Sequence, residues 1–530
     1  MSNKITYSSL KLSEEDHEAY EKALANFNLG QFCGLFVDGN EKMPFAMSMR
    51  DTLTDFDPSD TSRIVSRFIV PDALDIELAI THATSACKKI EKMGWERRLE
   101  ILLNMQPLIA NRAHNIAATL TYEIGKTRGE AYAEIYEVSA MIDAYKRFAN
   151  EQNFWQWPLS DGMDAPFEKT MVSMQPLGGP VAIIGPFNFP FALVANSAMA
   201  AFLAGNPIII KGSVDAPLAG LEWRNIMVDA GVPEEACLYL TGPGKQVGDA
   251  LIRSRNIAHI GFTGSREIGF HISHLRAEMG LPNTITAEMG GKNAVVVTEN
   301  ANLEAAANGI IKSCIGFSGQ KCSAVSRVYV ARKIYRHLIA VLLEKARGQK
   351  IIVGDPKLRE TTLGPLISAK GKNWHNRIGE IVLTQKGSIY KLSATSADGL
   401  NNVGHFVLPF MASDISHNHP VARDEHFTPF FTVHPVDTLE EAVNKVNDSP
   451  YGLCAGIFTT IEDEMDYFED NVEAGVTYVN RRAGATTGAW PTIQAFGGWK
   501  ESGIGGVQAF GPYYVLRFSR QQTRTRVSRK

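Results

Sequence analysis

The chain has 530 residues, of which 45% are hydrophobic and 21% are charged, and its formal net charge is −4. This composition is typical of a soluble globular protein of two or three domains. The small negative charge excludes the basic surface that nucleic-acid binding requires. Because no apolar stretch reaches about 18 residues and the start lacks a signal peptide, we expect no membrane span and a cytoplasmic location.

The cysteine pattern indicates neither a disulfide framework nor a zinc site. Six cysteines are scattered along the chain without any Cys-x-x-Cys pair, so we predict no metal centre. A reducing compartment, in which a reactive thiol survives, suits this pattern.

The first half of the chain predicts a helical region followed by a parallel sheet. Residues 1–50 are polar and irregular, and we interpret them as an extension over the main body. Apolar residues at helical intervals predict helices between Asp75 and Lys146. Short apolar strands alternate with helices beyond that point, with strands expected at residues 181–184, 207–210, 238–240 and 259–262 and helices at 191–203, 217–230, from 245 and from 266. This order is typical of a doubly wound α/β sheet, which binds ligands beyond the carboxyl ends of its strands.

Two further regions complete the organisation. The segment Asn153–Gln175 fits either a hairpin that reaches another subunit or a plain surface loop. A second α/β region begins with the strand Ala294–Val297, continues through Arg327–Val330 and extends to about Asn480.

Cys322 and Glu288 are the first candidates for catalysis. Cys322 lies among small residues in Gly319-Gln320-Lys321-Cys322-Ser323, and Glu288 opens Glu288-Met289-Gly290-Gly291-Lys292. A thiol can act as a nucleophile, and a carboxylate can take its proton or activate water. A cysteine among small residues is also a common packing residue.

Other polar residues follow the predicted strands, each with an ordinary structural alternative. Asn188 can donate to an oxyanion or cap the next helix. Lys211 is either a donor to ribose or a solvated strand end. Thr263-Gly264-Ser265 opens a helix, where free N–H groups favour phosphate, although many such turns bind nothing. Glu425 and Phe427 offer a carboxylate for a diol and a flat ring, or form an acidic turn.

The order of these motifs resembles that of the NAD(P)-dependent aldehyde dehydrogenase superfamily. The resemblance runs from about residue 50 to the C-terminus and ends with Phe496-Gly497-Gly498. It implies a Rossmann-type cofactor domain, an α/β catalytic domain and a small β oligomerisation arm. The implied ranges are 1–50 for the extension, 51–152 and 179–288 for cofactor binding, 153–178 and 506–530 for the arm, and 289–505 for catalysis.

The resemblance also implies roles for the site residues. Cys322 attacks the aldehyde carbon, Asn188 and the Cys322 N–H hold the oxyanion, and Glu288 activates the water that releases the acid. The cofactor, NAD or NADP, accepts the hydride. The residues implied to bind it are Lys211, Ser213, Thr263, Gly264, Ser265, Glu425 and Phe427.

Within the superfamily, the chain is most similar to 1-pyrroline-5-carboxylate (L-glutamate γ-semialdehyde) dehydrogenases. Ser323 with Gly488 and Ala489 implies a carboxylate-binding nest, and Phe189 and Phe496 would flank the aliphatic middle of the substrate. Another semialdehyde, a broad range of aldehydes, or a catalytically silent structural homologue are the alternatives. The arm implies a homodimer or higher homo-oligomer.

One departure concerns the cofactor. Gly212-Ser213-Val214 stands where the family often has an acid that grips the adenosine 2′-hydroxyl and repels a 2′-phosphate. The sequence therefore leaves the choice between NAD and NADP open.

Overall fold

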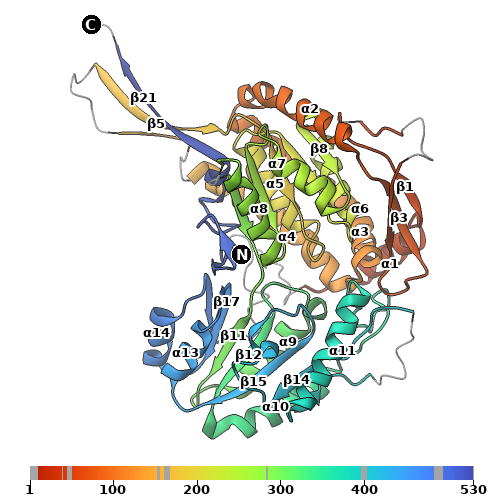
Figure 1. Ribbon diagram of the computed structural model, residues 1–530, viewed down its shortest axis with the longest axis vertical. Coiled ribbons are helices and arrows are strands. Elements are labelled where there is room, and N and C mark those ends of the chain that lie inside the picture. The colour runs from red at the N-terminus through yellow and green to blue at the C-terminus, as the bar shows by residue number, and fades with distance from the viewer. Residues whose placement is uncertain are drawn as a thin grey trace.

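The computed structural model describes residues 10–38, 40–43, 50–151, 155–159, 167–281, 284–395, 403–482 and 493–528. It has two lobes, each built around a sheet of mainly parallel strands, and a thin β arm that projects from one lobe (Figure 1). The predicted α/β architecture is confirmed. Among the described residues, no helix is both long enough and apolar enough to cross a membrane.

The expectation of an irregular start is wrong for residues 14–25, which form helix α1 (Glu14–Ala25). The Ser13 and Asp16 side chains make a reciprocal capping box that satisfies free N–H groups at the helix start. Tyr20 is fully buried and its hydroxyl hydrogen-bonds that of Thr121 at 2.6 Å. Local capping and one anchoring aromatic thus order this segment despite its polar composition.

The predicted helical region consists of three long helices, and a small sheet precedes it. The helices are α2 (Ala73–Lys92), α3 (Trp95–Ile124) and α4 (Arg128–Glu151). Helix α3 ends because Gly125 adopts a left-handed conformation with φ 70°, which a glycine tolerates. The small sheet has the order β1 (Gln31–Cys33), β3 (Ile64–Ile69), β2 (Thr52–Phe56).

The first large sheet has the strand order β20-β10-β9-β6-β7-β8, and only β20 runs antiparallel to its neighbour. Its parallel strands are short and almost wholly buried, as expected for a sheet covered on both faces. The strands are β6 (Val181–Ile184), β7 (Ile208–Lys211), β8 (Cys237–Leu240), β9 (His259–Thr263), β10 (Ile285–Glu288) and β20 (Gly503–Ile504). The helices that follow them are α5 (Ala192–Leu203), α6 (Pro217–Asp229), α7 (Asp249–Arg253) and α8 (Arg266–Glu278).

The second large sheet has the order β13-β14-β15-β12-β11-β17-β18. Its strands are β11 (Asn293–Val297), β12 (Val325–Ala331), β13 (Ser388–Lys391), β14 (Phe410–Ser413), β15 (Phe430–Val436), β17 (Cys454–Phe458) and β18 (Val476–Val479). Its helices are α9 (Leu303–Ile315), α10 (Tyr335–Gly348), α11 (Ala369–Thr384), α12 (Pro420–Arg423), α13 (Leu439–Asn447) and α14 (Glu462–Asn471). A two-stranded pair, β16 (Tyr451–Gly452) and β19 (Trp499–Lys500), lies outside this sheet.

The arm is made by segments far apart in the sequence. Strand β5 (Glu168–Pro176) pairs with β4 (Gln156–Pro158) on one edge and with β21 (Ser519–Val527) on the other. Within the segment that fitted either a hairpin or a surface loop, residues 156–158 and 168–176 therefore form strands. Nearly all of β21 is exposed, and the arm extends away from both lobes (Figure 1).

Candidate active site

A cavity of about 570 Å³ brings the predicted chemistry together. It lies beyond the carboxyl ends of β6, β9 and β10, where a parallel sheet is expected to bind ligands. The predicted site residues that line it are Asn188, Ser213, Thr263, Gly264, Ser265, Glu288, Cys322, Glu425, Phe427 and Phe496.

Cys322 is positioned by a tight left-handed turn just before β12. Phe317, Ser318 and Gly319 have φ values of 46°, 55° and 71°. A Cβ at Gly319 would lie 2.4 Å from the Thr428 carbonyl oxygen, so this close approach requires glycine. Such strain is frequent at functional sites. The turn places Cys322 just before the amino end of β12, a strand of the second sheet.

The resting site holds a protonated thiol and a carboxyl group of weakened acidity. Burial, reinforced by the charges of Glu425 and Glu288, raises the pKa of Cys322 to about 12. Burial also raises the pKa of Glu288 to about 8, and a hydrogen bond from the Gly498 N–H opposes this shift. The Glu288 Oε2 atom is buried and has no hydrogen-bond partner in the part of the chain that the structure describes. A carboxylate in that setting is suited to accept a proton from water.

The Asn188 side chain does not cap helix α5, although its position in the sequence allowed that role. The N–H groups of Phe191 and Ala192 at the start of α5 donate to Glu134 at 3.0 and 2.9 Å. The Asn188 side chain instead donates to the Gln320 carbonyl oxygen at 3.0 Å. This contact ties the amide to the loop that carries Cys322, as an oxyanion donor requires.

Residues on the same cavity fit a dinucleotide. Ser265 caps α8 by accepting from the Ile268 N–H at 3.4 Å, and the helix N-terminus beside it suits a phosphate. Glu425 accepts from the Gly291 N–H at 2.9 Å, and burial raises its pKa to about 7. A Cβ at Gly290 would lie 1.9 Å from Glu425 Oε2, so Glu425 occupies a cradle that only glycine leaves open. A donor-rich helix start and an acid for a ribose diol are the groups that a nicotinamide dinucleotide needs.

Lys211 and Asp215 differ from the sequence expectation. The Lys211 ammonium donates to the Gly212 carbonyl oxygen at 3.0 Å and does not line the cavity; burial lowers its pKa to about 8. Asp215, which sequence reasoning missed, lines the cavity together with Ser213. An acid two positions beyond Ser213 was the available signal, because a short loop after a strand can present either residue to the same ligand.

The remaining predicted residues differ in whether they line the cavity. Phe427 and Phe187 meet edge to face, with ring centroids 5.9 Å apart, and both line the cavity. Phe189 does not line it; its ring lies under the Lys126 ammonium at 3.7 Å. Ser323 is buried and also absent from the wall. The predicted anchor residues Gly488 and Ala489 lie outside the described residues.

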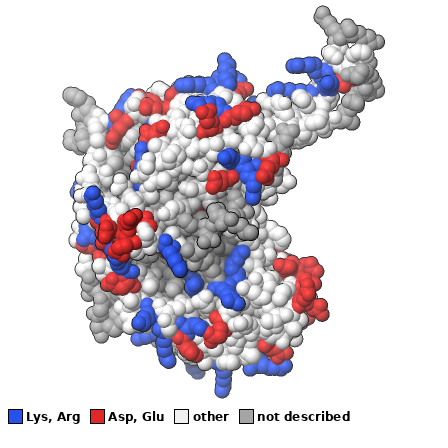
Figure 2. Space-filling view, turned by 180° about the vertical axis from the view of Figure 1, so that it is seen from behind, with Lys and Arg blue, Asp and Glu red and all other residues white. Residues whose placement is uncertain are grey.

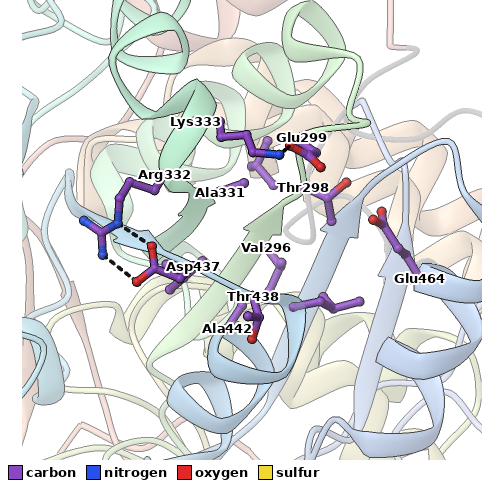
Figure 3. Close-up of a pocket in the computed structure, with 13 residues that line it drawn as sticks. Val296, Thr298, Glu299, Ala331, Arg332, Lys333, Asp437, Thr438, Ala442 and Glu464 are labelled. Atoms are coloured by element: carbon purple, nitrogen blue, oxygen red, sulfur yellow. Dashed lines mark hydrogen bonds and ion pairs between the residues drawn. The ribbon is translucent and has the colours of Figure 1, made fainter.

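A second cavity of about 420 Å³ lies at the carboxyl ends of β11, β12 and β15 (Figure 3). Four of its charged side chains form two ion pairs, and Glu464 accepts from the Asn300 amide at 2.9 Å. Arg332 donates to Asp437, with Nη2 3.1 Å from Oδ2, and Lys333 lies 2.8 Å from Glu299. None of the predicted site residues lines it.

On the face of the molecule in Figure 2, cationic and anionic side chains are interspersed over both lobes.

Comparison with known proteins identifies the family. The model of the aldehyde dehydrogenase family matches residues 45–524. The 1-pyrroline-5-carboxylate dehydrogenase of Geobacillus thermodenitrificans is 30% identical over 515 residues, covering 95% of this chain and 94% of the relative. That of Staphylococcus haemolyticus is also 30% identical, with 96% of each chain covered.

Solved structures agree with this assignment. The 1-pyrroline-5-carboxylate dehydrogenase from Thermus with bound NAD has a TM-score of 0.87 at 28% identity, covering 97% of both chains. A betaine aldehyde dehydrogenase from Staphylococcus aureus has a TM-score of 0.86 at 22% identity and covers 96% of both chains, which shows a shared fold. The chain belongs to the aldehyde dehydrogenase family and is an oxidoreductase that acts on aldehydes with a nicotinamide cofactor.

Proposed function

We propose that this protein oxidises L-glutamate γ-semialdehyde, the open form of 1-pyrroline-5-carboxylate, to glutamate. The observation that carries the proposal is the meeting of Cys322, Glu288 and Asn188 on one cavity wall. The curated and structural relatives named 1-pyrroline-5-carboxylate dehydrogenase support the choice of substrate.

The first half of the reaction builds a covalent intermediate. The Cys322 sulfur adds to the aldehyde carbon while its proton passes to solvent water, and the carbonyl oxygen becomes an oxyanion. The Asn188 amide and the Cys322 N–H donate to that oxygen, a contribution of about 3 to 4 kcal/mol for such a donor. The nicotinamide, when bound, takes the hydride, so the substrate remains on Cys322 as a thioester.

The second half is hydrolysis. The Glu288 carboxylate takes a proton from water, which adds to the thioester carbon, and the C–S bond then breaks to release the acid and Cys322. The Oε2 atom of Glu288, which has no partner among the described residues, supports this role, since its two lone pairs can accept from that water and from one further donor. Replacement by serine, Cys322→Ser, should abolish turnover, because an alcohol is a poor nucleophile here. A Cys322→Ser variant that still turned over an aldehyde would contradict the role of Cys322. Such turnover would also exclude a catalytically silent homologue.

Substrate choice rests on the carboxylate nest proposed at Ser323, Gly488 and Ala489, with Phe189 and Phe496 beside the aliphatic chain. Initial rates over aldehydes with and without a distal carboxylate provide the test. Better turnover of neutral aliphatic aldehydes than of glutamate semialdehyde would favour the alternative of a broad or different aldehyde dehydrogenase.

For the cofactor, we propose a preference for NAD over NADP. Lys211, Ser213, Thr263, Gly264, Ser265, Glu425 and Phe427 remain the proposed binding residues. Asp215 adds an acid to the wall at Ser213. A carboxylate there repels a 2′-phosphate.

We further propose a homodimer or a higher homo-oligomer in the cytoplasm. The exposed strand β21 at the edge of the arm offers unpaired backbone groups to another copy. All six cysteines are free, which suits a reducing compartment. Sedimentation of the full chain as a monomer at micromolar concentration would argue against assembly. The domain ranges given above remain part of this proposal.

A further inference from the structure

Helix α5 carries two polar side chains on an otherwise apolar, buried surface. Its sequence from Ala192 to Leu203 is Ala-Leu-Val-Ala-Asn-Ser-Ala-Met-Ala-Ala-Phe-Leu. Leu193, Asn196 and Ser197 lie on one face of the helix, and all three line the active-site cavity. Buried polar groups are retained where they have partners or a task.

Both polar residues are held by tyrosine hydroxyls. The Tyr145 hydroxyl donates to Asn196 Oδ1 at 2.6 Å. The Ser197 hydroxyl lies 3.0 Å from that of Tyr514, which is only 2% exposed and also lines the cavity. Tyr514, with its hydroxyl anchored by Ser197, therefore lines the same cavity as Glu288.

The C-terminal segment that carries Tyr514 contacts strand β10, which carries Glu288. Tyr514 begins the short 3₁₀ helix Tyr514–Phe518. From that helix, Arg517 donates to Thr286 Oγ1 at 3.3 Å, and Thr286 lies two residues before Glu288 on β10. Earlier in the same segment, Gly503 pairs with Glu288 itself. Tyr514 and Glu288 are thus fixed to one strand edge.

Electrostatics agree with this proximity. The charge of Glu288 raises the pKa of the Tyr514 hydroxyl, after the larger effect of burial. Glu288 has a buried oxygen without a partner among the described residues, and a carboxylate that becomes ionised during hydrolysis needs a donor. No other feature of the mechanism uses the hydroxyl pair of Tyr514 and Ser197.

We propose that Tyr514, anchored by Ser197, is a positioning residue that donates a hydrogen bond to the free oxygen of ionised Glu288. The donor stabilises the carboxylate and so lowers the pH at which Glu288 becomes an effective base. Ser197 accepts or donates at the tyrosine oxygen and fixes its direction. This assignment rests on the proposed role of Glu288 in hydrolysis, and it does not depend on which aldehyde is the substrate.

The test is the pH dependence of kcat for full-length wild-type protein and for Tyr514→Phe, with NAD and any aldehyde that the wild type oxidises. Phenylalanine retains the ring that packs edge to face on Phe518 at 5.4 Å. Loss of one charge-assisted donor should move the acid limb of kcat up by about one pH unit, which lowers kcat about tenfold at pH 7. The NADH burst and the kcat/KM for the aldehyde should stay unchanged, because both are set by the steps up to acylation.

Two variants serve as comparisons. Ser197→Ala should move the limb in the same direction by a smaller amount, because the tyrosine hydroxyl loses its anchor. Tyr513→Phe is the matched control, since Tyr513 is 60% exposed, and it should leave the profile unchanged. A Tyr514→Phe profile that superposes on the wild type, or a loss of burst and kcat together without a shift, overturns the assignment alone. A wild-type protein that forms no NADH from any aldehyde overturns the proposed function first.

Discussion

Replacing Glu288 by glutamine separates the two halves of the reaction. Glutamine has the size of glutamate and cannot take a proton, so acylation of Cys322 should continue while hydrolysis of the thioester fails. A positioned general base contributes roughly 100-fold to 10,000-fold. We expect kcat of Glu288→Gln to fall by at least about 100-fold, with the thiol and oxyanion contacts of Cys322 and Asn188 retained.

The pH profile follows from the environment of Glu288. Burial raises its pKa to about 8, so the ionised base is lost as the pH falls through that value. With that pKa only about a tenth of the carboxyl groups are ionised at pH 7, and kcat of the wild type should rise nearly tenfold from pH 6 to pH 7. The glutamine variant has no such group, and its residual rate should lack this limb.

Stopped-flow measurement of NADH provides the assay. Glu288→Gln should give a burst close to one NADH per active site followed by a slow steady state, because the thioester accumulates. Mass spectrometry of the quenched protein should find the acyl group on Cys322. A variant without a burst would refute the assignment of Glu288 to hydrolysis, and a variant with wild-type kcat would refute its role as a base.

Three further substitutions test the neighbouring contacts. Asn188→Ala should lower kcat by about 100-fold to 1,000-fold through loss of the oxyanion donor, measured in single turnovers; an unchanged rate would contradict that role. Gly290→Ala should displace Glu425, because the Glu425 Oε2 atom would lie 1.9 Å from the new Cβ. Glu425 would then lose its hydrogen bond to the Gly291 N–H, which contributes about 1.5 to 3 kcal/mol. This loss should raise the KM for NAD roughly tenfold or more. Asp215→Ala removes about 1 kcal/mol of repulsion and should shift kcat/KM roughly fivefold toward NADP, whereas an unchanged ratio would place the 2′-position elsewhere.

Local sequence patterns were sufficient for much of the fold. Continuous apolar runs such as Ile208–Ile210 specify a strand buried on both faces, and they do so without distant partners. Asn188 and Glu288 lie at the carboxyl ends of strands of the first sheet, whereas Cys322 precedes a strand of the second, so strand positions place each residue but do not join the two sheets. The prediction of their common site came from the resemblance to the aldehyde dehydrogenase superfamily.

Features that depend on distant side chains were less accessible. Helix α1 was predicted as irregular, because its order depends on Tyr20 contacting Thr121 across a hundred residues of sequence. Lys211 was expected to face the ligand, whereas its ammonium donates a hydrogen bond to the carbonyl oxygen of the neighbouring Gly212. The pairing of Ser197 with Tyr514 joins α5 to the C-terminal segment, and neither local pattern carries a sign of the other.

The glycine pair between β10 and β11 explains why the chemistry lies between two sheets. Glu288 ends β10 and Asn293 begins β11, so the chain passes from one lobe to the other within Met289-Gly290-Gly291-Lys292. A Cβ at Gly291 would lie 2.7 Å from the Cys322 carbonyl oxygen, and one at Gly290 would displace Glu425. Bare backbone at these two positions lets the Cys322 loop and the Glu425 carboxyl group approach the crossing that follows Glu288. The crossing between lobes therefore acts as part of the active site, and side chains added there should impair catalysis before they impair folding.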